Sequence, residues 1–134
     1  MKILLDTHIV LWSVLESSHL KTETKEVLLS SDNEIFYSVI SLWEVSLKHS
    51  INPKSMEISA SEFRNLCQES GFIELSVEYM HILGLDSLVQ KENYPIHRDP
   101  FDRILLSQSI AEGMMFLTHA SKIATFDSNN ILLV

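Results

Sequence analysis

Three acidic side chains lie where the hydrophobic pattern of the sequence calls for apolar ones. Asp6 follows the short apolar run ILL, Glu44 interrupts the apolar pattern of VISLWEVSLK, and Asp102 lies at the end of an inward-facing stripe in HRDPFDRILLSQS. A carboxylate placed toward the interior loses hydration and needs a cation or hydrogen-bond donors. Close carboxylates also raise one another's pKa unless a cation neutralises them. Together the three acids predict a negatively charged pocket for a hard cation, Mg²⁺ or Mn²⁺.

A divalent cation in such a pocket has a recognisable chemistry. It activates a water molecule and stabilises the charge that develops on a phosphodiester, so that neither a nucleophilic side chain nor a histidine base is required. His8, His97 and His119 lie near the proposed pocket in the sequence, but their spacing is not that of a zinc motif, and we expect surface or structural roles for them.

Each acid also has a simpler interpretation within its own segment. Asp6 is a good N-cap for the segment THIVLW, and Asp99 is a natural N-cap before Pro100. Glu44 can pair with Lys48 one helical turn later, in the favoured orientation. These alternatives stay open for the segments taken singly, and it is the combination of the three acids that favours the pocket.

The elements that must position these acids alternate between short apolar runs and stretches of helical spacing, which is typical of a parallel sheet covered by helices. Asp6 then lies at the carboxyl end of a central strand, where open α/β sheets bind their ligands. Glu44 lies on the shoulder of an apolar helical stripe of Ile40, Trp43 and Leu47. The sequence predicts strands at 2–5, 34–38, 72–75, 114–117 and 131–134, and helices through Leu11 to Leu15 and at 20–29, 39–49, 59–71, 77–85 and 99–111.

The length and composition of the chain limit the fold classes that are possible. The chain has 134 residues, which predicts one domain over 1–134, and 46% hydrophobic residues with three Gly and three Pro exclude disordered and collagen-like classes. The single cysteine, Cys67, excludes a disulfide framework and indicates a reducing compartment. Asp6 and His8 interrupt the apolar start before a signal peptide could form, and no run is long enough to span a membrane. We therefore expect a cytoplasmic protein.

The formal net charge of −8 argues against a protein that holds nucleic acid mainly by broad electrostatic attraction. A metal pocket would account for part of this charge, because its cation reverses the local sign. Lys48, Arg98 and Arg103 lie next to the acids and are the best candidates for phosphate contacts, with simple ion pairing as the alternative. Trp12 and Trp43 fit apolar helix faces, and we expect them in the core or an interface rather than stacked on bases.

The motifs LLDTH, SLWEVSLK and HRDPFDRILLSQS followed by FLT resemble, in this order and spacing, those of the PIN-domain ribonucleases. The likeness extends over nearly the whole chain, and within the family it is to the VapC-like toxins of bacterial toxin–antitoxin modules. It implies a three-layer α/β/α PIN-like fold with a central parallel sheet of about four to five strands. It also implies a Mg²⁺- or Mn²⁺-dependent endoribonuclease that acts on RNA, a cognate antitoxin that blocks the site, and commonly a homodimer.

Carried onto this sequence, the family's first three acids are Asp6, Glu44 and Asp102, with Asp99 as a secondary candidate. The fourth acid is missing, because Ala120 stands where the family places it, and we expect that Asp127 does not replace it. Either the natural protein lost this acid or the acid was replaced deliberately to silence a harmful enzyme, and the three intact positions favour the second explanation. The alternative function is a catalytically silent module that binds an antitoxin and acts through a regulatory complex.

Overall fold

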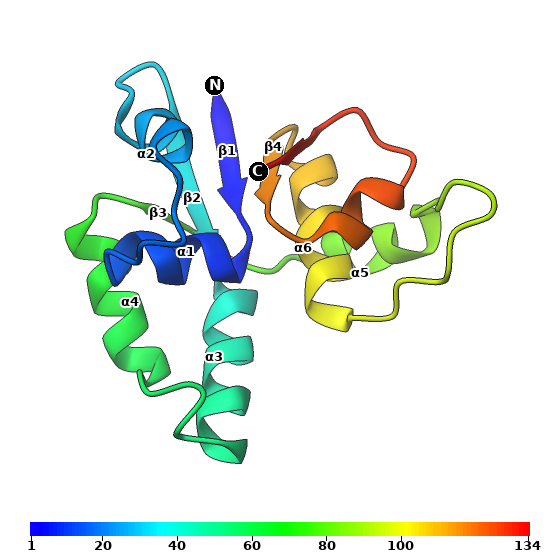
Figure 1. Ribbon diagram of the computed structural model, residues 1–134. Helices are drawn as coiled ribbons and strands as arrows, with labels where there is room; N and C mark the ends of the chain where they lie inside the picture. The colour runs from blue at the N-terminus through cyan, green and yellow to red at the C-terminus, as the bar shows by residue number, and fades with distance from the viewer.

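The first strand lies at the centre of the molecule. The computed structural model describes residues 1–134 and shows a five-stranded, all-parallel sheet in the order β3-β2-β1-β4-β5 (Figure 1). Its strands are β1 (Lys2–Leu5), β2 (Glu34–Ser38), β3 (Ile73–Leu75), β4 (Met115–Thr118) and β5 (Ile131–Leu133). The chain builds outward from β1 in one direction and then crosses to β4 on its other side. The direction of winding therefore reverses between β1 and β4, the place where open α/β sheets form a crevice.

Helices cover both faces of the sheet, and alternate residues of β1 face two separate cores. Ile3 and Leu5 belong to a core that also contains side chains of the first, second and fourth helices, whereas Leu4 belongs to a core with the sixth. The first face carries α1 (Thr7–Val14), α2 (Thr22–Leu29) and α4 (Ala60–Glu69), and the second carries α5 (Tyr79–Leu83) and α6 (Pro100–Ala111). The fold is therefore the expected three-layer α/β/α arrangement.

The remaining helix, α3 (Val39–Ile51), extends away from the carboxyl edge of the sheet (Figure 1). Ser38, the last residue of β2, caps it by accepting a hydrogen bond from the Ile40 backbone N–H at 3.0 Å. The predicted stripe of Ile40, Trp43 and Leu47 is wrong as a buried face, because Trp43 is 56% and Leu47 40% exposed. The buried residues of α3 are Ile40, which belongs to the predicted stripe, and Ser41, Glu44 and Val45, which do not.

The predicted helix over 77–85 begins two residues later in the structure and is only partly α-helical. It consists of α5 followed by a 3₁₀ turn, η1 (Gly84–Ser87), and a second 3₁₀ turn that the pattern did not predict, η2 (Ser121–Thr125), follows β4. Gly84 explains the tight packing of this region, since a Cβ there would lie 2.6 Å from the Ser107 hydroxyl oxygen on α6. None of the helices combines the length and the apolar character that a membrane crossing would require.

A chain of buried polar side chains joins α5 and α6 to the end of β2, and we call it the helix-joining network. The Ser38 hydroxyl donates to Gln108 Oε1 at 2.6 Å, and Gln108 Nε2 donates to the Ser76 carbonyl at 3.3 Å. His81 Nδ1 accepts from the Glu78 backbone N–H at 2.9 Å, while its Nε2 lies 2.8 Å from a Glu112 carboxylate oxygen. Since Ser38, His81 and Gln108 are wholly buried, these bonds offset the cost of burying polar groups.

Candidate functional site

Asp6 occupies the crevice between β1 and β4. It continues the ladder of β1, because its backbone N–H donates to the Leu117 carbonyl at 2.9 Å, and it is also the N-cap of α1. Its carboxylate accepts from the Thr118 hydroxyl at 2.5 Å and from the His8 backbone N–H at 3.2 Å. Burial raises the pKa of Asp6 above its ordinary value and the charge of Glu44 adds to the rise, although the Thr118 bond opposes it. Asp6 therefore caps a helix and is also a desolvated site carboxylate.

Glu44 is 3% exposed and lies on the buried face of α3. One of its oxygens, Oε2, pairs with the Lys48 ammonium one helical turn later. The other, Oε1, is buried without a hydrogen-bond partner, and no other buried side-chain nitrogen or oxygen is left in that state. A buried carboxylate oxygen that lacks a partner costs free energy in the absence of a ligand, and this cost points to a cation or donor that the chain itself does not supply.

Asp102 comes to the same place from the opposite face of the sheet. It lies in the first turn of α6, whose N-cap is Asp99, and Asp99 Oδ1 accepts from the backbone N–H groups of Phe101 and Asp102 at 2.9 and 3.2 Å. Asp102 Oδ2 lies 2.9 Å from His97 Nε2. Burial, followed by the charges of Asp6 and Asp99, raises the pKa of Asp102 to about 6 against the opposing contact with His97.

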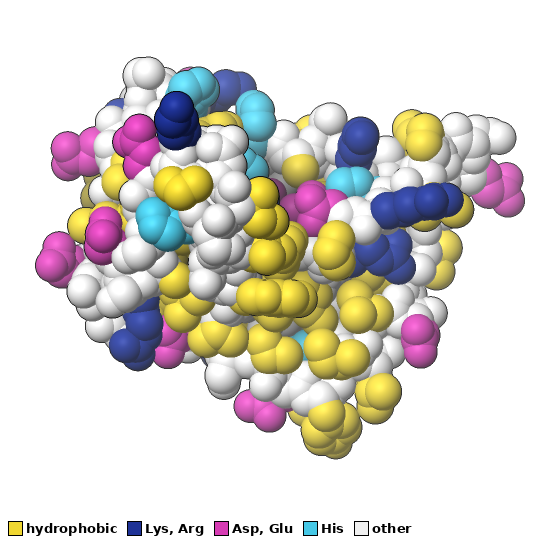
Figure 2. Space-filling view, turned by 90° about the horizontal axis from the view of Figure 1, so that it is seen from below, with side chains coloured by type: hydrophobic (Ala, Val, Ile, Leu, Met, Phe, Trp, Pro, Cys, Tyr) yellow, Lys and Arg dark blue, Asp and Glu magenta, His cyan; other side chains and the backbone are white.

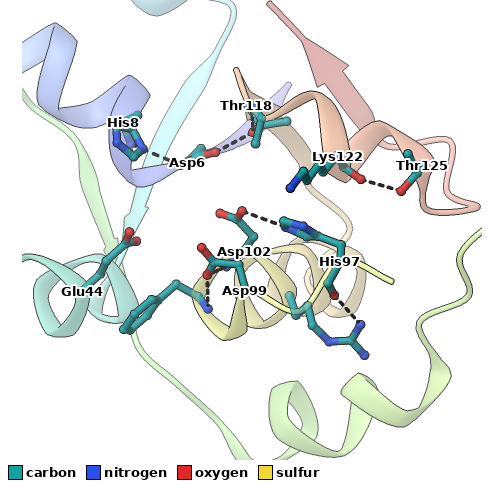
Figure 3. Close-up of polar contacts among 12 residues, drawn as sticks. Asp6, His8, Glu44, His97, Asp99, Asp102, Thr118, Lys122 and Thr125 are labelled. Carbon is teal, nitrogen blue, oxygen red and sulfur yellow. Dashed lines mark hydrogen bonds and ion pairs between the residues drawn. The ribbon is translucent and has the colours of Figure 1, made fainter. Parts of the chain in front are cut away.

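These side chains surround one cavity, with Asp6, Asp102 and Glu44 directed toward its middle (Figure 3). The cavity has a volume of about 380 Å³, and its lining consists of Asp6, His8, Trp12, Glu44, Lys48, Asp99, Asp102, His119 and Ala120. The structure thus brings together all three acids that the sequence selected, along with the secondary candidate. We call this set of acids and the space between them the carboxylate cavity.

The donor chemistry of the carboxylate cavity suits a hard divalent cation. Its oxygens are carboxylates, one of them has no partner, and two of the acids, Asp6 and Asp102, have pKa values raised by burial and by the charges of neighbouring carboxylates. The side chains do not converge into a group of three or more acids, histidines or cysteines that would hold a metal ion by themselves. A cation such as Mg²⁺ that binds through one or two carboxylates, waters and substrate phosphate does not require such a group.

The fourth position is the one where the cavity lacks an acid. Ala120 lines it directly after β4, and its backbone N–H donates to the Thr118 hydroxyl oxygen at 3.0 Å. Asp127 does not line the cavity and lies exposed beyond η2. The expectation that Asp127 does not replace the missing acid agrees with this placement.

Several residues of the site have roles that the sequence did not reveal. His97 is 8% exposed and holds Asp102, a contact that depends on how the loop before α6 folds back on the helix. Arg103 donates to the His97 carbonyl at 3.2 Å and lies over the ring of Phe126, so it supports the site instead of facing the cavity. The Thr7 hydroxyl, next to Asp6, forms a hydrogen bond with the Ser41 hydroxyl on α3 at 2.8 Å.

Comparison with known proteins agrees with this fold. The family model of the PIN domain matches residues 3–129, and the chain therefore belongs to the PIN domain family. Among solved structures, it is similar to the crystal structure of VapBC2 from Rickettsia felis bound to a DNA fragment from their promoter. That match has a TM-score of 0.70 and 18% sequence identity, and it covers 100% of this chain and 98% of the other. No curated protein matches the sequence.

Proposed function

We propose that this protein is a metal-dependent endoribonuclease that hydrolyses RNA phosphodiesters, as the toxin of a toxin–antitoxin pair. The observation that carries the proposal is the partnerless oxygen of Glu44 in a cavity shared with Asp6 and Asp102. Membership of the PIN domain family and the likeness of the fold to VapBC2 support it. A buried set of carboxylates with raised pKa values costs stability unless a ligand binds there, and evolution retains such a cost where function requires it.

In this proposal Asp6, Glu44 and Asp102 hold Mg²⁺ or Mn²⁺, with Asp99 at the edge of the set. The bound cation supplies a water of lowered pKa and neutralises charge on the phosphate. Thr118 fixes the orientation of the Asp6 carboxylate, and His97 fixes that of Asp102. Substrate phosphate completes the ligands that three carboxylates leave open.

The test is incubation of the purified chain with RNA and Mn²⁺, with and without EDTA, alongside the Ala120→Asp variant. We expect Ala120→Asp to restore or strongly raise cleavage, because a fourth carboxylate at the end of β4 completes the cavity. Ala120→Asp combined with Asp6→Asn controls for contaminating nuclease and should be inactive. A folded Ala120→Asp protein that cleaves no better than the parent would sink the proposal for this site.

A catalytically silent module is the second candidate, and it is favoured by one observation. Ala120 leaves the cavity without its fourth acid, and the remaining side chains form no group that holds a metal ion by itself. Such a module would bind an antitoxin and act through the complex, for instance on its own promoter. Cleavage by the chain as it stands excludes this candidate. Cleavage by Ala120→Asp alone shows that the fold is competent and that the alanine silences it.

A cognate antitoxin is the protein partner that we propose, and we place the pair in the cytoplasm. The solved complex from Rickettsia felis contains two proteins and promoter DNA, which supports both a partner and a regulatory role. Because the cavity is acidic, the segment of the antitoxin that blocks it should carry Lys or Arg. A product of the neighbouring reading frame that binds this chain and inhibits Ala120→Asp would support the assignment.

We also propose a homodimer. Figure 2 shows a broad apolar area on the side toward which α3 extends, and α3 exposes three large apolar side chains there, Trp43, Leu47 and Ile51. Exposed apolar areas of this kind on soluble proteins mark interaction surfaces. Light scattering after size exclusion should give twice the mass of 15.3 kDa, and Ile51→Glu should shift the protein to the monomer. A monomeric parent at micromolar concentration would contradict the dimer.

A further inference from the structure

Trp12 is surrounded by three imidazole rings. The His19 ring stacks on the indole with centroids 5.4 Å apart and planes 18° apart. The His119 ring meets it edge-on at 4.9 Å, and the His8 ring lies 6.2 Å away at a tilt of 59°. These residues come from α1, from the loop after α1 and from the segment after β4, so the fold assembles them from distant parts of the chain. We call them the histidine–tryptophan wall.

Hydrogen bonds fix two of these rings in place. His119 Nδ1 lies 2.9 Å from the Val134 carbonyl, and since a carbonyl only accepts, this ring nitrogen carries the proton. His119 Nε2 has no partner of its own in the protein and is left to interact with a ligand. His19 Nδ1 lies 3.0 Å from the Ser17 hydroxyl. A wall that is ordered before binding loses little conformational freedom when a ligand arrives.

The wall faces the same space as the acids. His8, Trp12 and His119 line the carboxylate cavity together with Glu44 and Asp102, which come from α3 and α6. The side chains of His8 and His119 are exposed, and Trp12 is half-buried, so these rings are available to a ligand. The lining of the cavity therefore contains both acids and flat rings, and a ligand that contacts both combines an anion that binds a metal ion with a flat ring.

We propose that the histidine–tryptophan wall binds a nucleobase of the RNA, next to the phosphate held at the carboxylates, and this inference rests on the proposed function. It replaces the expectation from the sequence that Trp12 lies in the core or an interface and does not stack on bases, because Trp12 is half-buried and lines the cavity. Aromatic and imidazole rings stack on unpaired bases and contact their edges. Stacking depends little on the RNA sequence because every base has a flat face. With a net charge of −8 the chain has little general attraction for the phosphate backbone, and base contacts at the wall supply the affinity that charge does not.

The test measures binding without cleavage, through the fluorescence of Trp12. The chain has two tryptophans, so Trp43→Phe leaves Trp12 as the only reporter, and Trp43 is exposed enough for the exchange to be mild. The probes are a short single-stranded oligoribonucleotide and an abasic oligonucleotide of the same length, with Ca²⁺ as a cation that prefers oxygen ligands. We expect saturable quenching by the intact oligonucleotide and binding roughly tenfold weaker for the abasic one.

Variants locate the contact on the wall. His119→Ala and His8→Ala should each weaken binding of the intact oligonucleotide several-fold and leave binding of the abasic one unchanged. His49→Ala is the matched control, because His49 lies on α3 outside the cavity, and it should bind both probes as the parent does. Equal affinity for the two probes, or wall variants that bind like the parent, would overturn the inference.

The outcomes separate this inference from the proposed function. If Ala120→Asp cleaves RNA and the wall variants bind and cut as before, the wall has no part in base recognition and the nuclease stands. If neither intact nor abasic oligonucleotide binds and Ala120→Asp does not cleave, the proposed function fails and the wall inference fails with it. If only a segment of a protein partner quenches Trp12, the wall is a protein contact and the base subsite is refuted.

Discussion

The helix-joining network and the carboxylate cavity are both built from buried polar side chains, yet the fold treats them differently. In the network, Ser38, His81 and Gln108 all have partners within the chain. In the cavity, Glu44 Oε1 has none, and burial raises the pKa values of Asp6 and Asp102. Buried polar side chains that make all their hydrogen bonds fix how the helices pack. A buried polar atom without a partner raises the free energy of the folded protein, and a ligand that pairs with it removes this cost. The difference distinguishes a structural polar cluster from a functional one.

The largest change in the free energy of unfolding should follow from replacing Gln108, the residue at the centre of the helix-joining network. Gln108→Leu leaves the Ser38 hydroxyl and the Ser76 carbonyl without their partner, and we expect the free energy of unfolding to fall by about 2–4 kcal/mol. Urea denaturation measures the change. Gln68→Leu is the matched control, because Gln68 is exposed on α4, and it should stay within about 0.5 kcal/mol. A Gln108→Leu protein that is as stable as the parent would contradict the difference drawn between the helix-joining network and the carboxylate cavity.

Replacement of Asp102 in the carboxylate cavity should change the free energy of unfolding by a smaller amount and in the opposite direction. The raised pKa of Asp102 means that the folded state holds its proton more tightly than the unfolded state, so stability falls as the pH rises from about 4 to about 6. Asp102→Asn imitates the protonated form and should stabilise the metal-free protein by about 1–2 kcal/mol at pH 7, allowing for partial solvent screening.

Chemical denaturation at pH 7 and pH 4 checks this expectation, since the gain should vanish at the lower pH. Asp127→Asn is the control, because Asp127 is exposed and outside the cavity, and its stability should not change with the same pH dependence. An Asp102→Asn protein that is less stable than the parent at pH 7 would show that the contact with His97 outweighs the cost of burial.

Binding of a divalent cation should stabilise the folded protein, because the cation neutralises the buried carboxylates. At a Mn²⁺ concentration ten times its dissociation constant, the folded state gains about 1.4 kcal/mol by mass action. The melting temperature should therefore rise with Mn²⁺ but not with K⁺ at equal ionic strength, and Glu44→Gln should reduce the rise. An equal rise in Glu44→Gln would show that the cation binds elsewhere.

The smallest effect is expected at Lys48, the one cation already paired with a cavity acid. Its side chain is 40% exposed, but the side chain of Glu44 is 4% exposed, so loss of the pair leaves both buried Glu44 oxygens without a partner. Lys48→Met should lower the free energy of unfolding by about 1 kcal/mol, the lower end of the cost of an unpaired buried acceptor. A loss of several kcal/mol would mean that Lys48 serves as the counter-ion of the cavity and that no ligand is needed there.

The sequence predicted the sheet, the helices and three acids that the structure places around one cavity, for physical reasons that differ from residue to residue. Asp6 and Asp102 were recognisable because each breaks or ends a short apolar pattern beside a helix start. Glu44 lines the carboxylate cavity, although the helix face on which it lies was predicted wrongly. Trp43 and Leu47 are exposed, and periodicity alone does not distinguish an apolar side that faces the core from one that faces solvent.

Local sequence patterns could not predict the helix-joining network or the histidine–tryptophan wall. Ser107, Gln108 and Ser109 form a polar run that is typical of a helix surface, yet all three are buried because the sheet and α5 cover α6 from two sides. Trp12 and His119 are more than a hundred residues apart, and only the pairing of β1 with β4 brings them together. Contacts of this kind depend on the tertiary fold, which a single sequence does not display.

The central position of β1 has a consequence for the order of events during synthesis. The bond between Asp6 and Thr118 spans 112 residues, so a growing chain contains the Asp6 carboxylate long before the hydroxyl group that orients it. Contacts between such distant residues form late and slowly. A growing chain that ends before β4 lacks one of the two neighbours of β1, together with Thr118, His119 and Ala120. The carboxylate cavity therefore forms only after the ribosome has synthesised β4.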